Sequence, residues 1–149
     1  MKKLLMTLMA AMLPLLAFAG DWIEMLSKDD VTYYIYSSIE DEYDEHLAWI
    51  KMTYNTPASR KVATERFEQD ELVFESRVLY AFNSAWTMMN NKSITFYGAG
   101  GSVINTYTFD DLSNWSHITP DSLGEGFRDY ARELYNTSNA KSSEEWSDF

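Results

Sequence analysis

Hydrophobic and polar residues alternate along short runs between Asp21 and Phe109, which is the pattern of half-buried β-strands. The runs are rich in Val, Ile, Thr, Tyr, Phe and Trp, and polar clusters separate them. The pattern therefore predicts one antiparallel sheet. The predicted strands are residues 22–26, 31–36, 46–54, 67–82, 93–97 and 102–109.

Turn residues predict how some of these strands are joined. The polar cluster 27–30 closes a first hairpin, and the glycine-rich segment 98–101 closes another because glycine accepts a positive φ. The acidic run 40–45 is expected as a solvated loop tip. Its five carboxylates leave a calcium site open as an alternative, although the run lacks the alternation and central glycine of an EF-hand loop.

Two segments between strands have weaker patterns. Residues 55–64 contain Pro57 and a basic pair, and are expected as a long surface loop. Residues 83–92 stay ambiguous. They either continue a strand or form a two-strand excursion that turns at Asn90 and Asn91.

The hydrophobic period changes from two to 3.6 after the last predicted strand, which indicates an amphipathic helix. Ser122 and Glu125 form a capping-box pattern at its start, and the helix is expected to end near Asn136. The predicted fold class is therefore α+β, a single antiparallel sheet of about six strands covered by a C-terminal helix. The apolar face of the helix consists of Leu123, Phe127, Tyr130, Ala131 and Leu134.

The first nineteen residues have the pattern of a secretory signal peptide. Lys2 and Lys3 precede an apolar run that ends in Ala17-Phe18-Ala19, a small-residue cleavage site. We therefore expect a cleaved signal peptide at 1–19, a folded domain at 20–136 and a flexible acidic tail at 137–149. The protein is expected in the periplasm, on the cell surface or outside the cell, with no transmembrane segment in the mature chain.

Composition narrows the classes of partner. Loss of the two N-terminal lysines takes the formal charge from −11 to −13, and a field of this sign disfavours nucleic acid as a partner. The sequence contains no cysteine, so the expected domain depends on its hydrophobic core alone. No residue pattern indicates a cofactor, so none is expected.

The order of short motifs resembles the bacterial surface-adhesin protein E family. The motifs are a Trp at the mature start, the Trp49 strand, a Tyr-Gly hairpin at Tyr97, and a step before the helix formed by Trp115, Ile118, Pro120 and Ser122. The resemblance implies a sheet covered by a C-terminal helix, and a role in binding host matrix or plasma proteins. Family members commonly tie helix to sheet with a cysteine pair, which this chain lacks. Without that pair, the helix is expected to be held by Leu123, Phe127, Tyr130 and Leu134 alone. The predicted helix-docking motif consists of Trp115, Ile118, Pro120, Ser122, Phe127, Tyr130 and Leu134.

Aromatic residues are the expected binding groups, because the strands carry more of them than one sheet face can bury. The expected function is a non-catalytic, exported binding domain that contacts host or envelope proteins. A structural accessory subunit of an envelope assembly is an alternative. The candidate binding residues are Tyr34, Tyr36, Trp49, Trp86, Tyr97 and Tyr107.

The two histidines are the remaining candidates for chemistry. His46 follows two acidic residues and is a possible metal ligand, but no second His or Cys lies at ligand spacing, so an exposed structural histidine is favoured. His117 lies near serines, yet no nucleophile motif surrounds it. A His-centred periplasmic metal protein or hydrolase therefore stays an alternative, while the expectation is no catalytic residue and no metal ligand.

Overall fold

The computed structural model describes residues 20–109 and 114–147, so the predicted signal peptide at 1–19 lies outside the described part. The sheet is antiparallel throughout, as the sequence predicts. Six strands form its main path in the order β1-β2-β4-β5-β6-β7. The strands are β1 (Trp22–Lys28), β2 (Val31–Tyr36), β3 (Glu40–Glu42), β4 (Glu45–Tyr54), β5 (Glu75–Asn83), β6 (Met88–Tyr97), β7 (Val103–Thr108) and β8 (Ser116–His117).

Two short strands extend the main path. β3 pairs with the first residues of β4, and β2 pairs with the later residues of β4. β8 pairs with the start of β6. Tight turns with positive φ at Asp29-Asp30 and at Tyr43-Asp44 join β1 to β2 and β3 to β4. Only Tyr43 and Asp44 of the acidic run form the turn. Glu40–Glu42 form β3 and Glu45 begins β4, so the prediction that the whole run 40–45 is a loop tip is wrong for these four residues.

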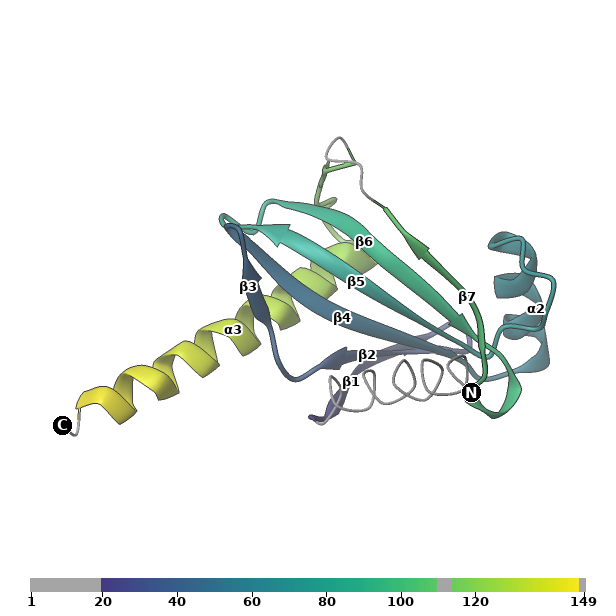
Figure 1. Cartoon of the computed structure of the whole chain (residues 1–149), viewed down its shortest axis with the longest axis horizontal. Helices are drawn as coiled ribbons and strands as arrows, with labels where there is room; N and C mark the ends of the chain where they lie inside the picture. Colours follow the sequence, from purple (N-terminus) through teal and green to yellow (C-terminus); the bar gives the residue numbers. More distant parts are fainter. Residues whose placement is uncertain (1–19, 110–113, 148–149) are drawn as a thin grey trace, which may run out of the picture.

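Two α-helices lie against one face of this sheet. α3 (Leu123–Ser147) crosses the sheet, and its C-terminal half projects beyond the strands (Figure 1). α2 (Pro57–Arg66) lies at the opposite end of the sheet (Figure 1). A short 3-10 turn, η1 (Ala99–Gly101), joins β6 to β7. None of the helices in the described part of the chain is long and apolar enough to cross a membrane.

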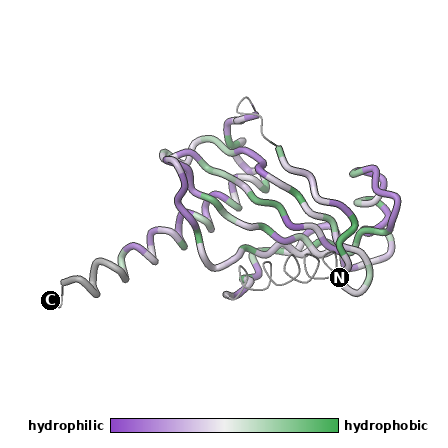
Figure 2. The backbone as a smooth tube through the Cα atoms, in the orientation of Figure 1, coloured by the Kyte–Doolittle hydropathy of each residue, from purple (hydrophilic) through white to green (hydrophobic). Residues whose placement is uncertain are grey.

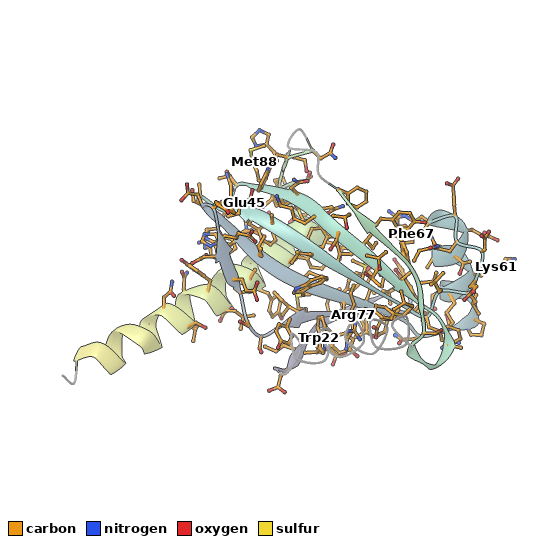
Figure 3. The ribbon with its side chains drawn as sticks, viewed as in Figure 1. Trp22, Glu45, Lys61, Phe67, Arg77 and Met88 are labelled. Atoms are coloured by element: carbon orange, nitrogen blue, oxygen red, sulfur yellow. The ribbon has the colours of Figure 1, made fainter. Side chains whose placement is uncertain are left out.

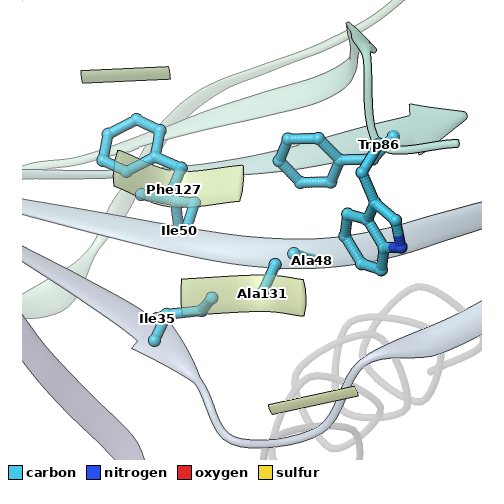
Figure 4. Packing of buried hydrophobic residues seen from close by; sticks show 7 residues of the cluster. Ile35, Ala48, Ile50, Trp86, Phe127 and Ala131 are labelled. Carbon is cyan, nitrogen blue, oxygen red and sulfur yellow. The ribbon is translucent and has the colours of Figure 1, made fainter. Parts of the chain in front are cut away.

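The main hydrophobic core lies between the sheet and α3. Phe127 and Ala131 of α3 pack against residues of β2, β4 and β5 (Figure 4). Because side chains alternate along a strand, Ala48 and Ile50 of β4 point to this face while Trp49 points away from it. The buried cluster consists of Ile35, Ala48, Ile50, Phe82, Trp86, Phe127 and Ala131.

A second, smaller core lies under α2. Ala63 of α2 packs against Tyr54 of β4 and Phe96 of β6, and Val73 completes the cluster. α2 itself is largely hydrophilic, as the tube in Figure 2 shows. It is fixed at its start by Thr56, whose side chain accepts a hydrogen bond from Ser59 N at 3.1 Å. The prediction of a surface loop at 55–64 is therefore wrong.

The boundaries of β5 and β6 also differ from the prediction. The predicted strand 67–82 begins only at Glu75, because Phe67 caps α2 and a loop follows it. The chain then turns at 84–87, where Trp86 takes a positive φ of 59°. Asn90 and Asn91 lie inside β6 and do not form a turn. The hairpin around 98–101 is confirmed.

α3 extends to Ser147, so the prediction that it ends near Asn136 is wrong. No glycine or proline interrupts the sequence between these two positions. A helix with no breaker continues even where few side chains pack, and residues 136–140 are exposed. Residues 148–149 of the predicted tail lie outside the described residues.

Candidate functional site

Four of the six predicted binding residues lie together on the sheet face opposite α3. Register places Tyr34 beside Lys51, and Lys51 beside Arg77. Trp22 of β1 joins them, with its ring 5.5 Å from the Tyr36 ring in an edge contact. We call this surface the aromatic face and define it by its five rings. They belong to Trp22, Tyr34, Tyr36, Trp49 and Tyr97.

Two cations lie among the rings of the aromatic face. Lys51 Nζ is 4.6 Å from the ring centres of both Trp22 and Tyr34. The Arg77 guanidinium carbon is 4.7 Å from the Tyr97 ring and 5.5 Å from the Trp22 ring. Trp22 and Arg77 therefore meet, although they come from β1 and β5 (Figure 3). Such cation–π contacts hold long, flexible cations in place.

Burial changes the electrostatics of the aromatic face. Desolvation lowers the pKa of Lys51, and nearby Arg77 lowers it further, while Glu75 acts in the opposite direction. Desolvation also raises the pKa of Tyr97. Glu75 Oε2 accepts a hydrogen bond from Arg77 Nε at 2.8 Å, so the guanidinium has both a carboxylate and aromatic partners. Tyr34, Lys51 and Tyr97 are nevertheless half-buried and partly reachable.

Two predicted binding residues are not part of the aromatic face. Trp86 is buried in the main core on the α3 side. Tyr107 is 43% exposed, and its ring packs edge-on against Phe96 at 6.1 Å, in the core under α2. The sequence pattern does not show that these two side chains lie apart from the other four. The sheet face to which a side chain points depends on strand register, and register depends on pairing with residues distant in sequence.

His46 is buried, so the preferred expectation of an exposed histidine is wrong. Its ring stacks on Trp86 at 4.2 Å with an angle of 6°, and Tyr135 of α3 packs against it at 4.4 Å. Nδ1 lies 2.6 Å from Asp41 Oδ1 of β3. The Tyr135 hydroxyl donates to the other oxygen of Asp41 at 3.0 Å. His46 therefore links β4, β3 and α3.

The metal and calcium alternatives receive no support from side-chain placement. Among residues 20–109 and 114–147, no three His, Asp or Glu side chains come close enough to hold one metal ion. Within the acidic run, Asp41 bonds to His46 and Glu45 lies 3.1 Å from Lys92 Nζ. His117 is exposed on β8.

The predicted helix-docking residues divide into two groups. Phe127 is buried in the main core, and Ile118 and Leu134 pack against that core. The Ser122 hydroxyl accepts from Glu125 N at 3.2 Å, which is the predicted N-cap contact. Pro120 is exposed, Tyr130 is 38% exposed, and the Trp115 ring lies 5.9 Å from Lys92 Nζ.

Sequence reasoning missed a groove between α2 and α3. It has a volume of about 880 Å³, within the range of small-molecule sites, and the sheet forms its floor. Apolar side chains of α2 and α3 form the walls, including Val62 and Leu123. The groove was not predicted because the sequence pattern predicts a surface loop at 55–64, where α2 forms one wall. Thr56 followed by Pro57 was the signal that could have located α2, since threonine caps helices and proline suits the first turn.

Three tyrosines lie on the floor of the groove. Desolvation raises the pKa of Tyr80 to about 12, and the neighbouring Tyr54 and Tyr33 raise it as well. Desolvation also raises the pKa values of Tyr33 and Tyr54. The positive charge of Arg66 opposes the shift in all three. The hydroxyls are therefore neutral hydrogen-bond donors at physiological pH, near a cation on the groove wall.

No protein-family model, no curated protein and no solved structure matches this chain. The resemblance to the surface-adhesin protein E family therefore rests on the short sequence motifs alone.

Proposed function

We propose that this protein is an exported, non-catalytic binding domain that contacts a host-matrix or bacterial-envelope protein through the aromatic face. The observation that carries the proposal is the gathering of Trp, Tyr and Arg on one sheet face. These three residue types dominate the energetic centres of protein interfaces. The resemblance to the protein E family supports the same class of partner.

The geometry of the face supports a role in recognition. The rings stand on paired strands, so they lose little conformational freedom when a partner binds. Lys51 and Arg77 are held over rings, and Glu75 pairs with Arg77, so Lys51 is the cation that presents a fixed positive charge in a chain that is acidic overall. A partner segment with an exposed carboxylate and an apolar side chain would fit both features.

The test is binding of the purified protein to a panel of matrix and plasma proteins and to envelope proteins, measured by surface plasmon resonance. The double variant Tyr34→Ala, Tyr97→Ala removes two half-buried rings and should weaken binding by about 2 kcal/mol or more, roughly thirtyfold. Circular dichroism checks that the variant keeps its fold.

Tyr43→Asn is the matched control. Tyr43 is 91% exposed in the β3–β4 turn, away from the aromatic face, and asparagine tolerates its positive φ of 50°. This variant should bind as the wild type does. Absence of saturable binding to every protein in the panel, or an equal loss in Tyr43→Asn, would contradict the proposal.

A further inference from the structure

The groove between α2 and α3 has an apolar wall on its α3 side. Met89, Ile118 and Leu123 line it together with Phe127, and none of the four carries a charge. Met89 lies close to α3, since a Cβ at Gly124 would meet Met89 Sδ at 2.8 Å. An acyl chain fits such a wall because transfer of each CH₂ group from water to an apolar surface is favourable.

The floor of the groove offers hydrogen-bond donors. Neither the Tyr33 nor the Tyr80 hydroxyl makes a hydrogen bond to another side chain in the described part of the chain. Both side chains line the groove. Two neutral donors in a desolvated place favour a ligand with strong acceptor oxygens, such as a phosphate group.

The charged groups of the groove have both signs. Arg66 lines it from the end of α2, and no carboxylate among the described residues lies within ion-pair distance of its guanidinium. Asp29 and Asp30 line it from the β1–β2 turn, and Asp29 acts electrostatically on Tyr33, as Arg66 does. An anionic head group would be attracted by Arg66 but repelled by the two aspartates. A cationic head group would be attracted by the two aspartates but repelled by Arg66.

We propose that this groove binds a single-chain zwitterionic phospholipid. The phosphate lies at Arg66 and the tyrosine hydroxyls, the amine faces Asp29 and Asp30, and the acyl chain follows the α3 wall. The groove volume of about 880 Å³ suits one small amphiphile. This site is on the opposite side of the sheet from the aromatic face and does not depend on the function proposed for that face.

The test is isothermal titration calorimetry of the purified protein with lysophosphatidylethanolamine below its critical micelle concentration. A fatty acid and an alkylammonium of equal chain length test the head group. The wild type should bind the zwitterion saturably, with one site, and about tenfold more tightly than either single-charge amphiphile. Equal affinity for all three would overturn the zwitterion assignment.

Three variants of α2 test the location of the site. Arg66→Gln should weaken lysophosphatidylethanolamine binding about tenfold and strengthen alkylammonium binding, because it removes a charge that repels a cationic head group. Val62→Asp places a negative charge on the apolar α2 wall, at a position that is already exposed, and should weaken binding of lysophosphatidylethanolamine and of the fatty acid about tenfold. Lys61→Gln is the matched control, because it also removes one positive charge unit but does not line the groove.

Lys61→Gln should bind within about twofold of the wild type. Thermal melting of each variant separates a loss of binding from a loss of fold. The proposal is overturned if the wild type shows no saturable binding of lysophosphatidylethanolamine. It is also overturned if Lys61→Gln weakens binding as much as Arg66→Gln does, since only the overall charge would then matter.

Discussion

The attachment of α3 to the sheet depends on Phe127, and its replacement by alanine is the sharpest test of the fold. Phe127 is 3% exposed, and its ring lies 5.8 Å from the Tyr33 ring and 5.7 Å from the Tyr80 ring. The sequence contains no cysteine, so no disulfide holds the helix if this contact is lost. We therefore expect Phe127→Ala to destabilise the whole domain.

The expected loss in the free energy of unfolding follows from the position of the Phe127 ring. Replacing a buried phenylalanine by alanine costs about 3 to 5 kcal/mol, and the cost grows with the dry cavity that remains. Phe127 also lines the groove, so the vacated space joins an existing hollow that water can enter. The expected loss is therefore at the lower end, about 3 kcal/mol, from a total stability of about 5 to 15 kcal/mol.

Urea denaturation followed by circular dichroism measures this free energy of unfolding. Tyr130→Ala is the control on the same helix, because Tyr130 is 38% exposed and its side-chain hydrogen bond within the described part of the chain, to the Met25 carbonyl, is long at 3.4 Å. It should cost less than about 1 kcal/mol. A loss below about 1 kcal/mol for Phe127→Ala, or equal losses for both variants, would refute the packing of α3 described above.

Two further predictions concern buried polar groups. Because the folded-state pKa of Tyr80 is raised to about 12 from an unfolded value of 10.0, its contribution to stability is complete below pH 10.0 and is lost as the pH rises toward 12. Urea midpoints across this range should fall less steeply in Tyr80→Phe, and identical slopes would contradict the burial of the hydroxyl. His46→Ala should cost about 2 to 4 kcal/mol because it removes the bond to Asp41 and the stack on Trp86. His117→Ala, at an exposed position, should cost less than about 0.5 kcal/mol in the same assay, and a similar loss in both would argue against the His46 contacts.

The parts of the fold that depend on local patterns were predictable from the sequence. Alternation over 46–54 predicted β4 closely, and the glycines of 98–101 located the last hairpin. The start of α3 at Ser122 was predicted because a capping residue acts on amides within its own first turn. These features depend only on interactions between residues that are close in sequence.

The features that depend on distant contacts were not predictable. His46 is buried because Trp86 and Tyr135, far away in the sequence, pack on its ring. The length of α3 was underestimated because the polar composition of residues 137–149 is typical of a tail, although no glycine or proline lies between Asn136 and Ser147. The grouping of four candidate aromatics on one face follows from pairing across β1, β2, β4, β5 and β6, and the groove follows from the placement of α2.

Hydroxyl-radical footprinting of the aromatic side chains, with and without the bound protein partner, tests the central claim most directly. The account predicts that the partner reduces oxidation of Tyr34 and Tyr97 on the aromatic face. Oxidation of Tyr43, which is 91% exposed in the β3–β4 turn, should stay unchanged. Protection of Tyr43 with no change at Tyr34 and Tyr97 would contradict the assignment of the binding surface.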